Sequence, residues 1–156
     1  TGHMVMSTLH TNDGPQTLTR LQDMGVQSFA VATSINLITA QRLLRRLNPD
    51  NRVEIEMPDD ALRKEDFPEE MIKAGMQLYG PGEETEENPG YKGRAGIYQV
   101  MPISEDLKRL IIEEANAVQL ADQAAKEGVW DIRRSGLQKV ADGITSLAEV
   151  NRVTVE

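Results

Sequence analysis

The pattern of apolar and polar residues predicts a strand at the start of the chain. In the stretch GHMVMSTLHTND, residues 2–13, Val5 lies among Met4, Met6 and Leu9. The stretch ends in a cluster of hydroxyl, amide and carboxylate side chains. Apolar residues of this kind favour a buried, extended backbone. We therefore expect a strand whose end presents polar groups, as strands of α/β proteins do.

Two helices are predicted next. Residues 14–25 begin with Gly14-Pro15 and end at Gly25, and their apolar residues recur at threefold spacing: Leu18, Leu21 and Met24. In QSFAVATSINLITAQRLLRRL, residues 27–47, apolar positions surround most of the predicted helix, so we expect it to be long and largely buried. Its last turn would carry three cations that suit the negative end of the helix dipole: Arg42, Arg45 and Arg46.

The rest of the chain divides into a middle segment of mostly irregular structure and a C-terminal part with a strand and helices. Residues 48–90 contain five prolines and predict a mostly irregular segment with one short helix near residues 69–74. YKGRAGIYQVMPI, residues 91–103, predicts a strand with Ile97 and Gln99 on one face. Helices are expected over residues 105–115, after the N-cap Ser104, over 117–127, and within 130–143 and 145–153. Ser146 and Glu149 have the spacing of a capping box.

Charge and composition narrow the class of protein. The 156 residues, 39% of them hydrophobic, suit one modest domain or part of a larger one. The net charge of −8 comes from residues 50–90, which hold 13 acidic and four basic residues. No basic stripe with interleaved aromatic residues is present, so we expect no nucleic-acid partner. Without a long apolar span or a signal peptide, the sequence predicts a cytoplasmic protein.

The candidate chemistry centres on the two histidines, His3 and His10. Their odd separation would place them on opposite faces of a strand, and no cysteine or further histidine could complete a zinc site. Ser7 has His10 nearby but no glycine elbow, so nucleophilic catalysis is not expected. The phosphate-binding pattern GxxxxGK[ST] is absent. On residues alone, a lone histidine beside an apolar strand is more often a hydrogen-bonded structural residue than a functional one, and this holds for both His3 and His10.

Five blocks of sequence, taken in order, resemble the C-terminal part of the type IV pilus assembly ATPases, in the superfamily shared with type II secretion ATPases. These blocks cover nearly the whole chain outside residues 49–90: TGHMVMSTLHTND, TLTRLQDMGV, ITAQRLLRRL, GYKGRAGIYQVMPIS and SGLQKVADGITSLAEV. The resemblance implies an α/β fold, the C-terminal portion of a RecA-like P-loop ATPase core followed by a helical C-terminal subdomain. Residues 1–47 would end the core, 48–90 would be an acidic insertion, and 91–156 would form a strand and the helical subdomain.

The resemblance also implies a function. Members of this family are hexameric motors that hydrolyse ATP with Mg²⁺ and act through an inner-membrane platform protein, so the parent protein would be a cytoplasmic homo-hexamer peripheral to that membrane. Walker A and Walker B lie upstream in the family, so this chain is expected not to hydrolyse ATP alone. The opening block matches the family's His box. By resemblance, His10 and His3 would sense the γ-phosphate or couple it between subunits, supported by Thr8, Thr11 and Asn12.

One departure from the family concerns zinc. Many relatives carry two CxxC pairs between the QRL block and GYKGR, and the matching positions here are Asn48, Asn51, Glu83 and Glu86. Zinc prefers sulfur and nitrogen ligands, so we predict no zinc. A weak Ca²⁺ or Mg²⁺ site among the glutamates of residues 83–87 is the alternative to a solvated acidic run.

Two other functions stay open at this point. The chain resembles the type II secretion ATPases as well as the pilus assembly ATPases. It could also act as an interaction module that binds a platform protein or a regulatory adaptor.

Overall fold

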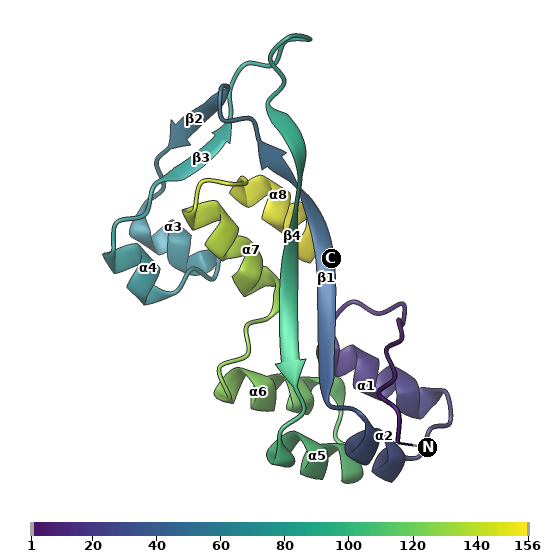
Figure 1. The fold of residues 1–156 in the computed structure, drawn as a ribbon. Helices are drawn as coiled ribbons and strands as arrows, with labels where there is room; N and C mark the ends of the chain where they lie inside the picture. Colours follow the sequence, from purple (N-terminus) through teal and green to yellow (C-terminus); the bar gives the residue numbers. More distant parts are fainter. Residues whose placement is uncertain (1, 156) are drawn as a thin grey trace. The chain divides into compact units, whose positions relative to one another are not determined.

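The computed structural model describes residues 2–155 and is mixed α/β, as predicted. Within that range it contains eight helices and four strands (Figure 1). In chain order these are α1 Gly14–Asp23, α2 Ser28–Ser34, β1 Leu37–Leu47, β2 Arg52–Ile55, α3 Asp59–Lys64, α4 Glu69–Lys73, β3 Leu78–Pro81, β4 Tyr91–Pro102, α5 Glu105–Ile112, α6 Ala117–Lys126, α7 Ile132–Ala141 and α8 Leu147–Thr154. The helices and strands form two compact units, which we describe separately.

The first unit comprises the residues up to Ala40 together with Gln99–Val129. It holds α1, α2, α5 and α6 with one end each of β1 and β4. Its core is made of buried apolar side chains from all of these elements: Leu18, Val31, Ala32, Ile38, Met101, Ile103, Leu107, Ile111, Ala115, Leu120 and Ala124. Gln22 on α1 donates to the backbone oxygen of Ile111 at 3.2 Å, which fixes α1 to the end of α5.

The second unit comprises Gln41–Tyr98 and the residues from Trp130 onward. In it α7 and α8 lie side by side, and Gly136 of α7 faces Val150 of α8 (Figure 1). A Cβ at Gly136 would lie only 2.9 Å from a methyl carbon of Val150, so the glycine allows this close approach. Buried apolar residues from several elements fill the core: Leu44, Leu47, Leu62, Phe67, Ile72, Leu78, Ile97, Ile132, Leu137, Val140 and Val150.

The long helix predicted over residues 27–47 is wrong beyond Ser34. Residues 28–34 are helical as α2, but the chain then extends as β1 and pairs with β4 in a two-stranded sheet. Exposure follows the period of a strand, because Leu37 is 55% exposed and Ile38 only 8%. The apolar pattern of this stretch is compatible with a buried helix and with a strand. The chain forms a strand here because it pairs with β4, which is distant in sequence.

Most other elements agree with the sequence analysis. α1 and β4 lie where predicted, and Ile97 and Gln99 share the buried face of β4 while Tyr98 and Val100 are exposed. Ser104 caps α5 by accepting from the amide of Leu107 at 3.1 Å. The remaining helices α6, α7 and α8 also begin and end close to the expected residues. None of the helices between residues 2 and 155 is long and apolar enough to span a bilayer.

Residues 48–90 contain more regular structure than predicted. The expected short helix is present as α4, but α3 and the antiparallel pair β2–β3 accompany it. In this pair Val53 lies opposite Gly80, and Ile55 lies opposite Leu78. A Cβ at Gly80 would clash with Ile55, so the isoleucine covers the glycine. Strand pairing between residues 23 to 29 positions apart could not be read from the local acidic pattern.

Candidate functional site

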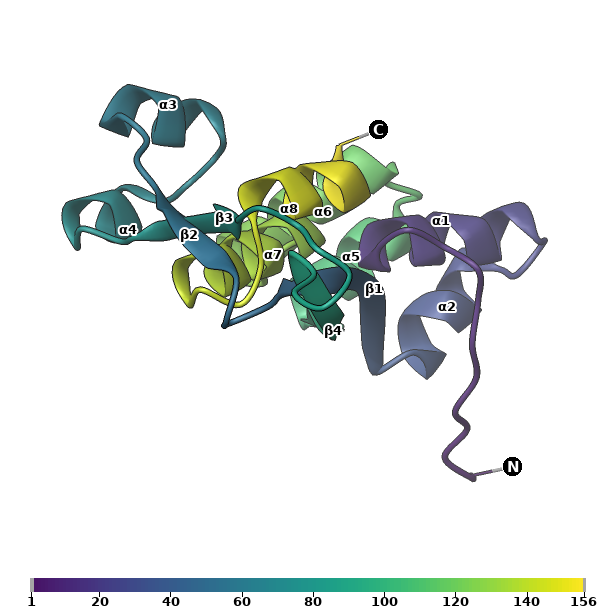
Figure 2. The same ribbon diagram turned by 90° about the horizontal axis from the view of Figure 1, so that it is seen from above.

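The predicted N-terminal strand is wrong: residues 2–11 form neither helix nor strand. They leave the start of α1 as an extended trace (Figure 2). Their apolar side chains are not buried, since Met4, Val5 and Met6 are each more than 80% exposed. A strand needs a neighbour to satisfy its backbone groups, and no strand in residues 2–155 pairs with this segment. We call residues 2–13 the His segment.

The end of the His segment is fixed to α1. The Asp13 side chain caps the helix by accepting from the amide of Gln16 at 2.8 Å. Thr17 of α1 donates its hydroxyl to the backbone oxygen of Asp13 at 2.8 Å, and its Oγ1 also lies 2.6 Å from Oγ1 of Thr11. The amide of Gly14 is bonded to Gln99 on β4. Two elements, α1 and β4, therefore hold the chain shortly after His10.

The residues that the sequence analysis predicted for the site differ in their exposure. His3, Thr8 and His10 are exposed on the extended part of the His segment, and Asn12 is exposed near its end. Thr11 is half-buried and meets Thr17. The structure thus brings one predicted supporting residue to α1 and leaves His10 exposed beside it, open to contact with another molecule or another part of a protein.

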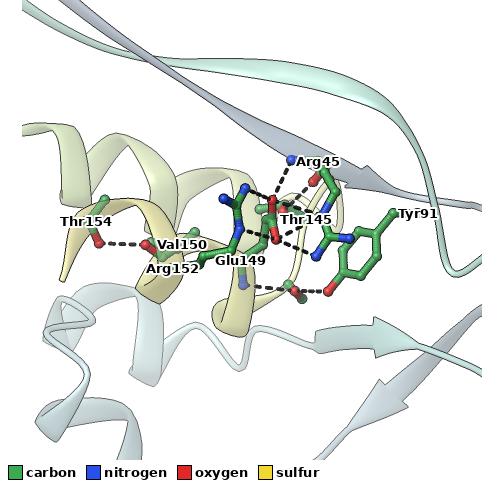
Figure 3. Close-up of polar contacts among 8 residues, drawn as sticks. Arg45, Tyr91, Thr145, Glu149, Val150, Arg152 and Thr154 are labelled. Carbon is green, nitrogen blue, oxygen red and sulfur yellow. Dashed lines mark hydrogen bonds and ion pairs between the residues drawn. The ribbon is translucent and has the colours of Figure 1, made fainter. Parts of the chain in front are cut away.

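A second polar site, in the other unit, was missed by sequence reasoning. Glu149 on α8 is only 1% exposed, and two arginines surround its carboxylate (Figure 3). The amide and guanidinium of Arg45, on β1, donate to it at 2.9–3.2 Å. Arg152, one turn further along α8, donates its Nε to the same carboxylate at 3.1 Å.

Neighbouring groups hold this cluster in place. The Arg45 guanidinium lies over the ring of Tyr91, 4.2 Å from its centroid. The Tyr91 hydroxyl lies 2.6 Å from Oγ of Ser146, the N-cap of α8, and Thr145 donates to the backbone oxygen of Arg45 at 2.8 Å (Figure 3). The end of β1, the start of β4 and the α7–α8 turn are therefore joined through one carboxylate and its partners.

The pKa of Glu149 shows how strongly these partners act. Burial alone would raise the pKa of this carboxyl, but the hydrogen bonds from Arg152 and Arg45 outweigh burial and lower it from 4.5 to about 2. The group is thus ionised throughout the physiological range. A carboxylate held in this form cannot exchange protons near neutral pH, so its role is structural rather than acid–base.

The predicted capping box at Ser146 and Glu149 is half right. Ser146 accepts from the Glu149 amide at 3.2 Å, but the Glu149 side chain turns to the arginines instead of returning to the cap. Arg45 was placed at the end of a helix by the sequence analysis. Its true strand position puts it beside a residue 104 positions away in sequence, which local patterns do not reveal.

Asn48 and Asn51, two of the four positions at which the resemblance implies cysteines, form a cluster of amide contacts. The Asn48 side chain is 4% exposed and donates to Oδ1 of Asn88 at 3.1 Å and to the backbone oxygen of Pro89 at 2.9 Å. Asn51 donates to the backbone oxygens of Glu83 at 3.1 Å and Asn88 at 2.9 Å. We call these contacts the asparagine clasp. They close the loop after β1 onto the loop before β4.

Metal-ligating groups are not gathered anywhere in residues 2–155. No three or more histidine, cysteine, aspartate or glutamate residues in that range are placed to hold a metal ion. The alternative Ca²⁺ or Mg²⁺ site among Glu83, Glu84, Glu86 and Glu87 therefore gains no support from the structure. The absence of zinc stays a prediction.

Comparison with known proteins places the chain in a family. The model of the family described as type II/IV secretion system protein matches residues 1–152. The chain belongs to the type II/IV secretion system protein family. This secretion system protein is 54% identical over 99% of its length to the type IV pilus assembly ATPase PilB of Pseudomonas aeruginosa. It is 44% identical over 96% of its length to PilB of Myxococcus xanthus, and 40% identical over its full length to the type II secretion system ATPase E of Vibrio cholerae.

The secretion system protein matches only part of each relative. It spans 27% of the Pseudomonas and Myxococcus proteins and 30% of the Vibrio protein. Its sequence has no GxxxxGK[ST] loop. We therefore assign the activity of the full-length relatives to this chain only as a proposal.

Proposed function

We propose that this chain is the C-terminal part of an ATP-hydrolysing motor that powers type IV pilus assembly. The observation that carries this proposal is the higher identity to the pilus assembly ATPase of Pseudomonas, 54%, than to the type II secretion ATPase of Vibrio, 40%, over nearly the same residues. Under this proposal residues 1–47 complete a RecA-like core, and 91–156 form the helical C-terminal subdomain.

The exposure of the His segment supports this proposal. His10 lies on an extended, exposed stretch, and Thr11 directly after it is held to α1, so its imidazole is accessible to a group supplied by the rest of the motor. A neutral or charged imidazole can hydrogen-bond a phosphate oxygen and respond to its loss. In our proposal His10, with His3, senses the γ-phosphate of ATP or relays its state to the next subunit, and Thr8, Thr11 and Asn12 support it.

The partners of the motor follow from the same proposal. The full protein would be a homo-hexamer that binds ATP with Mg²⁺ on the cytoplasmic face of the inner membrane, transmits force to a platform protein and responds to a regulatory adaptor. The isolated chain would not hydrolyse ATP, because it lacks a phosphate-binding loop.

A chimera tests the proposal. The corresponding quarter of Pseudomonas PilB is replaced by this chain, and the hybrid is expressed in a strain that lacks PilB. We expect surface pili to be restored, and we expect the same hybrid with His10→Ala to make few or none. A hybrid that accumulates as a folded hexamer yet makes no pili would overturn the pilus assignment.

The second candidate, a type II secretion ATPase, is supported by the 40% identity to the Vibrio protein. The parallel hybrid, with this chain in the Vibrio ATPase, separates the two. Restored protein secretion together with absent pili in the first hybrid would favour the second candidate. Measurable ATP hydrolysis by the 156-residue chain alone would contradict the claim that the nucleotide site needs other residues.

A further inference from the structure

Gln99 is a polar side chain on the buried face of β4. Its neighbours on that face, Ile97 and Met101, are fully buried, and Gln99 itself is 4% exposed. A buried amide must be hydrogen-bonded to be tolerated, and an apolar residue of similar size would pack there at lower cost. We therefore look for the reason for a glutamine at this position in the hydrogen bond that its amide group makes.

The amide oxygen of Gln99 holds the start of α1. It accepts a hydrogen bond from the backbone amide of Gly14, the first residue of the helix, at 2.9 Å, and this bond joins residues 85 positions apart. The start of α1 packs closely against the side chains of β4, because a Cβ on Gly14 would lie 2.9 Å from the Met101 terminal methyl and 3.2 Å from Gln99 Oε1. The helix start can thus shift little while the bond is intact.

Hydrogen bonds continue from this point toward His10. Gly14 follows Asp13, whose backbone oxygen accepts from the Thr17 hydroxyl, and Thr17 meets the hydroxyl of Thr11 at 2.6 Å. Thr11 directly follows His10. The end of the His segment is therefore located by α1, and α1 is located by Gln99.

We propose that Gln99 is a positioning residue for His10 in ATP turnover. This inference rests on the proposed function. Gln99 is buried, so it acts through Gly14 and α1 rather than by touching nucleotide. Its loss should leave ATP binding by the rest of the motor intact and displace His10 from its working position, which lowers kcat without raising KM.

The test uses the full-length motor and three variants. Gln99→Met removes the acceptor at similar volume, and Gln99→Glu keeps an acceptor at the same place, facing the positive end of α1. The matched control is Gln119→Met on α6, which removes another glutamine acceptor from the same unit, one whose side-chain oxygen accepts from the amide of Asn116 at 3.0 Å. We expect Gln99→Met to lower kcat about tenfold with KM for ATP within about twofold. Gln99→Glu should stay within about threefold of wild type, and Gln119→Met should lower the thermal midpoint without changing kcat.

Each outcome is decisive. Unchanged kcat in Gln99→Met, with an active wild type, overturns the inference, and so does an equal loss of kcat in Gln119→Met, because the effect would then be one of general stability. Failure of Gln99→Glu to recover activity also counts against it. A wild-type full-length protein that hydrolyses no ATP refutes the proposed function instead. In that case amide exchange of Gly14 in the 156-residue chain still tests the contact, and no acceleration in Gln99→Met would refute it.

Discussion

Replacing Glu149 by glutamine should destabilise the second unit strongly and in a pH-dependent way. The substitution keeps the shape of the side chain but removes the negative charge that Arg45 and Arg152 surround. A fall in pKa from 4.5 to about 2 corresponds to about 3 kcal/mol of folding free energy at pH 7. Both guanidiniums are about half exposed and can be hydrated after the change, so we expect a loss of about 2–3 kcal/mol.

The sign of the pH dependence follows from the lowered pKa. The stabilisation is fully present above pH 4.5, where the carboxyl is ionised in both states, and it is lost as the pH falls toward about 2. Urea unfolding of the 156-residue chain and its Glu149→Gln variant should thus differ most at pH 7. At pH 3 the difference should be less than about half as large.

A surface ion pair supplies the control for this measurement. Glu105 on α5 is 87% exposed and lies 3.2 Å from Lys108, so Glu105→Gln should change the free energy of unfolding by less than about 0.5 kcal/mol at either pH. If Glu149→Gln is as stable as wild type at pH 7, or if its deficit is the same at pH 3, the carboxylate does not stabilise the unit in the way described.

Three further substitutions test other contacts. Asn48→Ala removes three side-chain hydrogen bonds of a buried residue and should cost about 2 kcal/mol in urea unfolding; a cost below about 0.5 kcal/mol would show that the clasp is not needed. Gly136→Ala places a methyl 2.9 Å from Val150 and should destabilise by about 1–2 kcal/mol in thermal unfolding despite the better helix propensity of alanine, so increased stability would contradict the packing of α7 on α8. His10→Ala in the full-length motor should leave equilibrium ATP binding near normal and impair turnover, and weakened binding would instead indicate direct contact with nucleotide.

Local signals sufficed for the helices that carry their own boundaries. Ser104 and Ser146 cap α5 and α8 as predicted, and Gly25 follows the end of α1, because caps and stops depend on neighbours within one turn. β1 was mistaken for a helix, since its leucines suit either structure and its partner β4 begins 44 residues after β1 ends. Arg45 and Glu149 are 104 positions apart, so local patterns do not reveal their contact either.

The sequence analysis predicted residues of the candidate site but not their conformation or contacts. The resemblance identified His10 and Thr11, but the apolar pattern predicted a strand where the structure has an extended, exposed segment. Nothing near Gln99 in sequence indicates that its amide meets Gly14, because that contact depends on how α1 packs against β4. Long-range contacts of this kind need the folded chain to be seen.

The asparagine clasp has a consequence for the conditions under which the protein keeps its shape. Its donors are neutral amides and its acceptors are oxygens, so its hydrogen bonds need no metal ion and oxidants have no thiolate to attack. We predict that the loops it joins, after β1 and before β4, close during synthesis in a zinc-starved cell as readily as in a replete one.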